Sequence, residues 1–171
     1  TRGDIEINNI VPEHSRAVID KLIQSGADIK MQRDSVRVKM SKRPRAINIE
    51  TNAYPFFPTD MQAQMTALNC IADGDSSVKE NIFENRFMHA QELIRMGAKI
   101  RVHDNIAEIS GSEELLGAPV MATDLRASAS LILAGLAAKG TTEIGRVYHI
   151  DRGYECIEEK LNKLGAEIVR E

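Results

Sequence analysis

Leu93-Ile94-Arg95-Met96-Gly97-Ala98-Lys99-Ile100 is one of three copies of the sequence pattern that decides the fold. The same Leu-x-x-x-Gly-Ala step, followed by a polar residue and an isoleucine, occurs over residues 22–29 and 161–168. A glycine that opens a short β-like run precedes each copy, at Gly3, Gly74 and Gly140. These glycines are 71 and 66 residues apart, which is the period of a repeated supersecondary unit.

A second marker, the dipeptide Thr-Asp, opens an apolar helical stretch at Asp60 and again at Asp124, 64 positions later. The start of the chain lacks this marker, because Thr1-Arg2-Gly3 aligns with the end of that helix in the other copies. We therefore expect repeats over approximately residues 1–45, 46–111 and 112–171, with the first incomplete. Since there is also no initiator methionine, we expect residues 1–171 to form one domain, the C-terminal fragment of a two-domain protein.

The middle repeat shows the whole unit, which reads as strand, helix, strand, helix and two further strands. Met61, Met65 and Leu68 have the i, i+4 and i+7 spacing of one buried helix face. The other expected elements are strands over 46–49 and 76–83, a helix carrying Phe87, Ala90, Leu93 and Ile94, and a hairpin of 100–102 with 106–109. In the last repeat, Tyr154, Ile157, Leu161 and Leu164 predict a helix by the same kind of spacing.

A unit of this size cannot bury its own apolar helix faces, so neighbouring units must cover them. We expect the helices to pack together in one interior and the sheets to lie outside. The predicted fold class is α/β (α+β), a domain of repeated βαβαββ units.

Composition limits the function classes. With 43% hydrophobic and 27% charged residues, the chain falls in the ordinary range of folded globular domains, and its net charge of -3 gives no basis for nucleic-acid binding. The longest apolar run, 127–138, is too short and too interrupted to span a bilayer, so we expect a cytoplasmic protein without membrane association. Cys70 and Cys156 form no CxxC pair and are interpreted as buried thiols on helices, and no histidine spacing suggests a metal or cofactor site.

Charged residues gather where helices are expected to begin: Asp60, Arg86, Asp124, Arg126 and Arg152. An arginine in the first turn of a helix opposes the helix dipole, whereas a bound phosphate or carboxylate suits both the helix N-terminus and a guanidinium group. The pattern therefore predicts an anion site. Two plainer interpretations stay open: each aspartate can be an N-cap, and each arginine a solvated or ion-paired surface residue.

Four ordered segments resemble the family of UDP-N-acetylglucosamine enolpyruvyl transferases, enzymes of bacterial peptidoglycan synthesis. They are Phe57-Pro58-Thr59-Asp60-Met61-Gln62-Ala63-Gln64, Phe83-Glu84-Asn85-Arg86-Phe87-Met88-His89, Ala122-Thr123-Asp124-Leu125-Arg126-Ala127-Ser128-Ala129 and Tyr148-His149-Ile150-Asp151-Arg152-Gly153-Tyr154. The resemblance covers essentially the whole chain. It implies an inside-out α/β barrel-type domain, one of two domains that share an active-site cleft.

The resemblance also implies an activity: the enolpyruvyl group of phosphoenolpyruvate moves to the 3-hydroxyl of UDP-N-acetylglucosamine through a tetrahedral intermediate, and phosphate leaves. No metal is needed. By this resemblance, Asp60 binds the sugar hydroxyl and is its general base, and Ile82 and Phe83 contact the nucleotide sugar. The arginines around phosphoenolpyruvate correspond to Arg86, Arg126 and Arg152, with Asp124 as their acidic partner.

Two departures from the family pattern matter. Phe56 stands where the family has a glycine, and neither cysteine of the chain matches the family's catalytic cysteine. That cysteine, a lysine-asparagine pair and further arginines belong to the other domain or to the extreme N-terminus. We therefore expect the isolated chain to be inactive, and its incomplete first repeat to promote self-association through exposed apolar surface and an open sheet edge.

Two other functions are compatible with the sequence. A sister enzyme transfers enolpyruvyl to shikimate 3-phosphate with the same architecture, although the Phe-Pro-Thr-Asp-Met-Gln segment argues against it. The other alternative is a non-catalytic repeat module that binds a nucleotide sugar.

Overall fold

The first repeat forms a three-stranded sheet with one helix in the computed structural model, which describes residues 1–171. Its elements are β1 (Asp4–Asn8), a 3-10 turn (Pro12–Ser15), α1 (Arg16–Gln24), β2 (Asp28–Met31) and β3 (Ser35–Lys39). The strand order is β1-β3-β2, and both pairings are antiparallel. Ile5 and Ile29 both lie opposite Val38, so the apolar residues of the three strands share one face.

The middle repeat contains the complete βαβαββ unit. Its elements are β4 (Ile49–Glu50), the 3-10 turn η2 (Thr59–Met61), α2 (Gln62–Cys70), β5 (Asp75–Lys79), α3 (Met88–Arg95), β6 (Lys99–His103) and β7 (Ile106–Ser110). Its sheet has the order β4-β5-β7-β6, in which only the β4–β5 pair is parallel. Strands β6 and β7 confirm the expected hairpin, which turns at Asp104-Asn105.

Two strands of this unit are shorter than predicted, because side chains take the place of the strand ladder. The strand expected over 46–49 pairs only from Ile49, since the amide of Asn69 accepts from Ile47 N at 3.2 Å and donates to Ile47 O at 2.9 Å. The strand expected over 76–83 ends at Lys79, since the carboxylate of Glu80 accepts the next free N–H groups, those of Ile82 and Phe83.

The third repeat contains β8 (Pro119–Met121), α4 (Leu125–Ala137), β9 (Glu143–Gly145), α5 (Tyr148–Asp151) and α6 (Ile157–Asn162). The helix predicted from Tyr154 to Leu164 was too long, because Tyr154 lies outside it and Cys156 before it has the left-handed φ of 44°. Cys156 is also exposed, so the interpretation of both cysteines as buried helical thiols holds for Cys70 alone.

The repeated Leu-x-x-x-Gly-Ala step ends a helix in the same way each time. The N–H of the alanine donates to the carbonyl of the leucine five positions earlier at 3.0 Å for Ala27, 3.0 Å for Ala98 and 3.1 Å for Ala166. The intervening glycine has a positive φ in all three copies, for example 90° at Gly97. This is the Schellman hydrogen bond of a helix C-terminus, in which glycine adopts the left-handed conformation without a Cβ clash.

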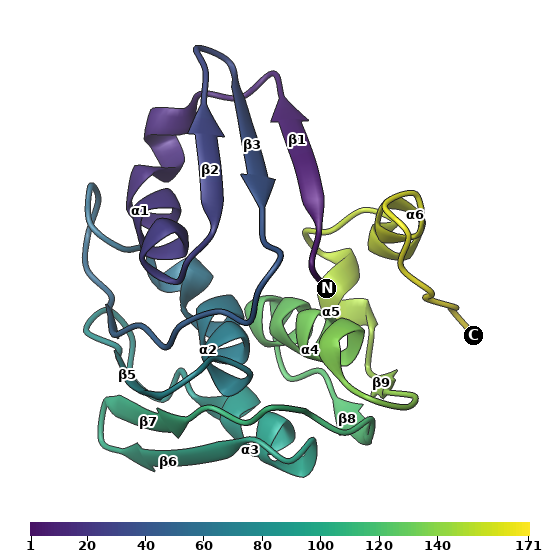
Figure 1. Cartoon of the computed structure of the whole chain (residues 1–171). Coiled ribbons are helices and arrows are strands. Elements are labelled where there is room, and N and C mark those ends of the chain that lie inside the picture. Colours follow the sequence, from purple (N-terminus) through teal and green to yellow (C-terminus); the bar gives the residue numbers. More distant parts are fainter.

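Helices α2, α3 and α4 occupy the interior between the sheets, which lie on the outside (Figure 1). The main apolar cluster joins the middle sheet to these helices, through residues such as Val78, Leu93, Ile109 and Leu131, each at most 1% exposed. The prediction of helices inside and sheets outside is confirmed. The three sheets remain separate rather than closing into one barrel.

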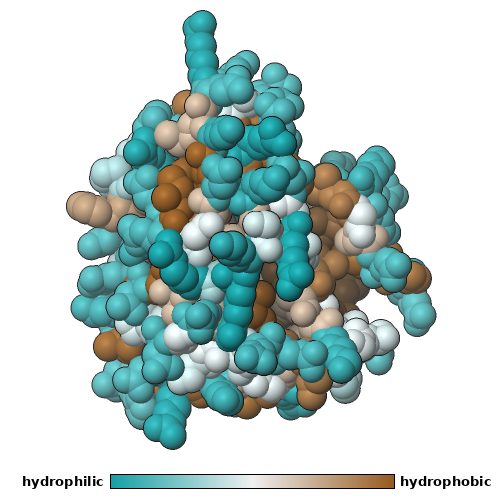
Figure 2. All heavy atoms as spheres, in the orientation of Figure 1, coloured by the Kyte–Doolittle hydropathy of each residue, from teal (hydrophilic) through white to brown (hydrophobic).

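Hydrophilic residues cover most of the face shown in Figure 2, with apolar residues visible in the hollows between them. None of the helices has both the length and the apolar character required to cross a membrane.

Candidate functional site

Asp60 lies in the 3-10 turn η2, directly before α2. The turn starts after Pro58, whose backbone is extended, and α2 receives no hydrogen bond from a capping side chain. The N-cap interpretation of Asp60 is therefore wrong. Its carboxylate is left to interact with other parts of the chain.

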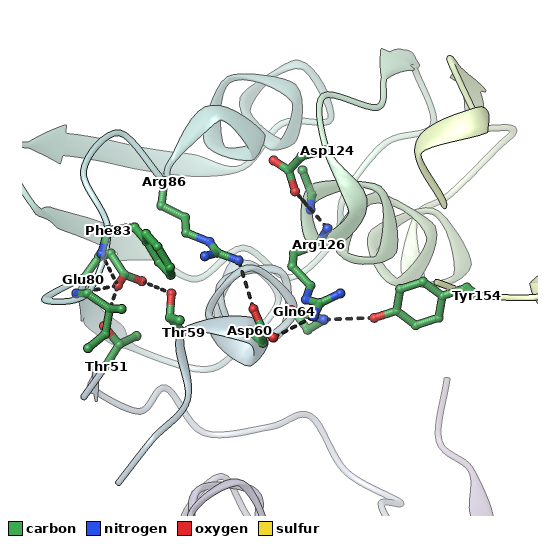
Figure 3. Close-up of polar contacts among 12 residues, drawn as sticks. Thr51, Thr59, Asp60, Gln64, Glu80, Phe83, Arg86, Asp124, Arg126 and Tyr154 are labelled. Atoms are coloured by element: carbon green, nitrogen blue, oxygen red, sulfur yellow. Dashed lines mark hydrogen bonds and ion pairs between the residues drawn. The ribbon is translucent and has the colours of Figure 1, made fainter. Parts of the chain in front are cut away.

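Two arginines from different elements bind this carboxylate (Figure 3). Arg86, from the loop before α3, places Nη2 3.1 Å from Asp60 Oδ1. Arg126, from the first turn of α4, places Nη2 2.6 Å from Asp60 Oδ2. The side chains are 23% and 28% exposed for the arginines and 53% for the aspartate, so the cluster is open to solvent from the aspartate side.

The pairing changes the acidity of both partners. The hydrogen bond from Arg126 is the main reason that the pKa of Asp60 lies below its usual range; burial opposes it, and the charges of Arg126 and Arg86 add to the lowering. The same bond raises the pKa of Arg126. Asp60 is therefore an ionised carboxylate at neutral pH, and an incoming anion would have to compete with it for the arginines.

Asp124 is an N-cap, as one of the two interpretations of it proposed. Its Oδ1 accepts from Arg126 N at 2.8 Å and from Ala127 N at 2.9 Å, which satisfies two free donors at the start of α4. The cap fixes the turn from which the Arg126 side chain reaches Asp60. Asp124 and Asp60 thus have different structural roles despite their equivalent places in the sequence.

The sequence placed Arg86 in the first turn of a helix, and this prediction is wrong. Helix α3 starts only at Met88, with Phe87 as its N-cap, so Arg86 lies in the loop before it. Its guanidinium carbon lies 4.7 Å from the centre of the Phe83 ring, a cation–π geometry. Arg86 therefore connects Asp60 to the segment containing Ile82 and Phe83, whose side chains are exposed.

Glu80 is a site residue that the sequence analysis missed. It is 2% exposed, and its carboxylate accepts hydrogen bonds from Thr51, Thr59, Ile82 N and Phe83 N (Figure 3). A signal was present: Glu80 shares the strand parity of Ser76 and Val78, which face inward. A charged residue continuing an inward-facing series predicts a buried, hydrogen-bonded carboxylate.

Gln64 and Tyr154 also belong to the surroundings of Asp60. Gln64 Nε2 lies 3.5 Å from the hydroxyl of Tyr154, which links α2 to the loop after α5 (Figure 3). The sequence analysis quoted both residues within the family segments but assigned neither to the site, and it interpreted Tyr154 as part of a helix face.

Arg152 is the one predicted arginine that does not join the cluster. It is the C-cap of α5 rather than a residue at the start of a helix, it is exposed, and it forms no ion pair. The following Gly153 packs so closely on α4 that a Cβ there would lie 2.9 Å from Leu125 Cδ2. Arg152 is thus held beside the start of α4 without contacting Asp60.

Phe56 lies 64% exposed in the turn that precedes Asp60, next to the buried Phe57. No group of three or more His, Cys, Asp or Glu side chains is arranged to hold a metal ion. The chemistry that the cluster itself offers is that of a carboxylate base beside guanidinium groups that can bind phosphate or carboxylate.

The chain is similar to known enzymes over almost its whole length. Residues 1–161 match the family EPSP synthase (3-phosphoshikimate 1-carboxyvinyltransferase). UDP-N-acetylglucosamine 1-carboxyvinyltransferase of Geobacter metallireducens is 61% identical over 170 residues, 99% of this chain and 41% of that protein. The enzyme of the same name from Hydrogenovibrio crunogenus is 56% identical, again over 99% of this chain and 41% of the relative. The chain thus spans about two fifths of the length of these relatives.

Solved structures show the same fold. The enolpyruvyl transferase NikO from Streptomyces tendae superposes with a TM-score of 0.84 at 30% identity, over 96% of this chain and 39% of that one. EPSP synthase from Acinetobacter baumannii gives a TM-score of 0.66 at 17% identity, over 84% of this chain and 35% of that one, which is a likeness of fold alone.

Proposed function

The chain belongs to the EPSP synthase family, and from this we propose that it supplies part of the active site of a UDP-N-acetylglucosamine 1-carboxyvinyltransferase. The reaction transfers the enolpyruvyl group of phosphoenolpyruvate to the 3-hydroxyl of UDP-N-acetylglucosamine and releases phosphate. The observation that carries the proposal is the ionised Asp60 carboxylate held between Arg86 and Arg126. The names of relatives up to 61% identical support the choice of substrates.

In this proposal residues 1–171 are one domain of a two-domain enzyme, built of repeats over approximately 1–45, 46–111 and 112–171. The second domain closes the cleft and supplies the remaining catalytic groups, including the family's cysteine. The isolated chain has no turnover. The enzyme works in the cytoplasm, in peptidoglycan synthesis, and so serves cell-wall growth, cell shape and division.

Asp60 acts as the general base for the attacking sugar hydroxyl. A carboxylate within hydrogen-bond reach of a hydroxyl removes its proton as the oxygen attacks carbon. Phosphate or carboxylate of phosphoenolpyruvate draws Arg126 away from Asp60, which removes the main cause of the low pKa of Asp60. Substrate binding thereby makes the carboxylate a stronger base at the moment when a proton must be taken.

Arg86, Arg126 and Arg152 bind the anionic groups of phosphoenolpyruvate, and Asp124 holds the turn that carries Arg126. Fixed positive charges stabilise the charge that develops as phosphate departs, without covalent participation of the protein. Ile82 and Phe83 contact the nucleotide sugar. Their exposed side chains and their connection to Asp60 through Arg86 support this assignment.

The experiment measures phosphate release by the full-length protein with UDP-N-acetylglucosamine and phosphoenolpyruvate. Asp60→Asn keeps the shape of the side chain and removes the base, so kcat should fall by about 100-fold or more. Arg126→Ala should raise the KM for phosphoenolpyruvate. Arg101→Ala, which removes an exposed arginine of β6 away from the site, is the control and should leave turnover unchanged.

The alternatives give different outcomes in the same assay. Turnover with shikimate 3-phosphate and none with UDP-N-acetylglucosamine would identify the sister reaction. Unchanged turnover in both Asp60→Asn and Arg126→Ala would leave this chain the role of a non-catalytic nucleotide-sugar-binding module.

A further inference from the structure

Glu80 is a buried carboxylate that the proposed reaction does not use. It lies one residue beyond the end of β5 and is 2% exposed. Burying a carboxylate is costly unless its oxygens are hydrogen-bonded. The donors around Glu80 therefore offset the cost of burying it.

The four donors come from three segments of the chain. Oε1 accepts from Thr51 Oγ1 at 2.8 Å, from Ile82 N at 2.9 Å and from Phe83 N at 3.2 Å. Oε2 accepts from Thr59 Oγ1 at 2.9 Å. Glu80 thus ties the residue directly before Asp60 to the segment of Ile82 and Phe83.

These contacts close a circuit around the site (Figure 3). Asp60 follows Thr59 in the chain, Thr59 binds Glu80, and Glu80 binds the Phe83 backbone. The Phe83 ring then lies under Arg86, which returns to Asp60. A closed circuit fixes the separation between the carboxylate and the loop more firmly than Arg86 alone can, because the exposed ion pair is individually weak.

We propose that Glu80 is a positioning residue, which sets the Asp60 turn and the Ile82–Phe83 segment at the separation that the nucleotide sugar requires. This inference rests on the proposed function. Both N–H groups of the segment are bound to Glu80, and its carbonyl oxygens accept no hydrogen bond from the chain, so these oxygens remain free to accept one from a ligand.

Kinetics of the full-length protein test the proposal. Glu80→Ala should raise the KM for UDP-N-acetylglucosamine by about tenfold or more and lower kcat, since displacing a reacting group by about 1 Å costs on the order of 100-fold in rate. The KM for phosphoenolpyruvate should change less. A role confined to folding would reduce the amount of active protein and kcat, with both KM values unchanged.

Glu80→Gln is the conservative variant. Its amide oxygen can keep the three donors of Oε1, while its amide nitrogen donates to the Thr59 hydroxyl, which can accept. It should keep the nucleotide-sugar KM within about threefold of the wild-type value. Glu108→Ala, on the exposed face of β7 in the same sheet, is the matched control and should match the wild type.

Thr59→Val breaks the circuit at one bond and replaces Glu80→Ala if the latter does not fold. It should lower kcat while the nucleotide-sugar KM stays near the wild-type value, because Ile82 and Phe83 remain bound to Glu80. Wild-type kinetics in a folded Glu80→Ala, or in Thr59→Val, would overturn the proposal.

Amide hydrogen exchange gives a readout that is independent of turnover. The Ile82 and Phe83 amides should exchange more slowly in the wild type and in Glu80→Gln than in Glu80→Ala. A wild-type protein without transferase activity would refute the proposed function, and exchange would still report whether Glu80 orders the segment. Equal exchange in wild type and folded Glu80→Ala would refute the positioning role.

Discussion

Asp60 and Arg126 lie 66 residues apart in sequence, yet each sets the acidity of the other. An arginine beside a carboxylate favours its charged form and so depresses its pKa. The charge of the site therefore depends on how α4 is placed against the turn before α2. A change at either partner should be visible at the other.

Removing the arginine should raise the pKa of Asp60. In Arg126→Ala the hydrogen bond that lowers the pKa of Asp60 most is lost, and only Arg86 remains as a partner. The measurement is a pH titration of the Asp60 carboxyl carbon by NMR, with Arg101→Ala as a control that keeps the wild-type pKa. An Asp60 titration that is identical in Arg126→Ala and wild type would contradict the ion pair.

The two cysteines should react very differently with a thiol reagent. Burial raises the pKa of the Cys70 thiol to about 12, whereas Cys156 is exposed. Because the thiolate is the reactive form, at pH 8 the native chain should titrate as one thiol and the unfolded chain as two. Cys156→Ser should abolish the native reaction and Cys70→Ser should leave it; rapid labelling of native Cys156→Ser would be contrary to this packing.

At the scale of the elements, some glycines are needed for space and others for their backbone angle. A Cβ on Gly111 would lie 1.9 Å from Ala72 O, where the chain leaving β7 crosses the end of α2. The same atom on Gly97 would meet nothing within 4 Å, although the φ of Gly97 is 90°. The first position cannot accept a side chain without moving backbone, while the second carries only a conformational cost.

Gly111→Ala should therefore destabilise the fold more than Gly97→Ala. The Gly97 change should cost about 1 kcal/mol, the typical penalty for a left-handed alanine. The Gly111 change should exceed about 3 kcal/mol, in the range of severe backbone or overpacking strain. Urea unfolding of the two variants gives the comparison, and equal losses would argue against the close crossing.

At the scale of the whole molecule, part of the first sheet has no cover. Ile5 and Ile7 on β1 are 39% and 43% exposed, and β1 is an edge strand. The face in Figure 2 likewise shows apolar residues around this sheet and near the C-terminal helices. Open edges and exposed apolar surface favour association.

We predict that the isolated chain self-associates and that Ile7→Lys shifts it towards monomer. Glu6→Lys places a lysine on the opposite face of β1, so this variant should self-associate like the wild type. Sedimentation velocity over a concentration series measures both. A wild-type chain that stays monomeric throughout would count against the prediction.

Acid should destabilise the fold through His89. Burial is the main reason that the pKa of His89 is lowered to about 4, and its Nε2 has no hydrogen-bond partner. The unfolded chain takes up a proton near the ordinary histidine pKa and the native chain does not. Stability is therefore complete above about pH 6.5 and falls as the pH drops towards 4, by up to about 3 kcal/mol.

Urea unfolding from pH 7 to pH 4.5 tests this linkage. His89→Gln should show a shallower loss of stability with acid than the wild type, whereas His14→Gln, at an exposed position, should keep the wild-type slope. Parallel slopes for wild type and His89→Gln would mean that another group is responsible.

Local signals determined the elements of this protein. The three Leu-x-x-x-Gly-Ala steps form their helix ends through hydrogen bonds within six consecutive residues, and Asp124 caps α4 through donors two and three positions away. Each of these interactions joins residues that are close in the sequence. The repeats, the inside-out packing and the resemblance could therefore be predicted from the sequence. The late start of β4 was harder to predict, because Asn69 reaches Ile47 across 22 positions.

Only the tertiary structure decided what the site residues do. Asp60 and Asp124 occupy equivalent places in the repeat, but one caps a helix and the other binds two arginines that come from 26 and 66 positions away. Arg152 matched the family motif but lies outside this cluster, and buried Glu80 binds Thr59 and the Ile82–Phe83 segment beside it. These roles depend on how helices and sheets pack against one another, and an ion pair or a buried carboxylate is fixed by the partners that packing brings near it rather than by its neighbours in the chain.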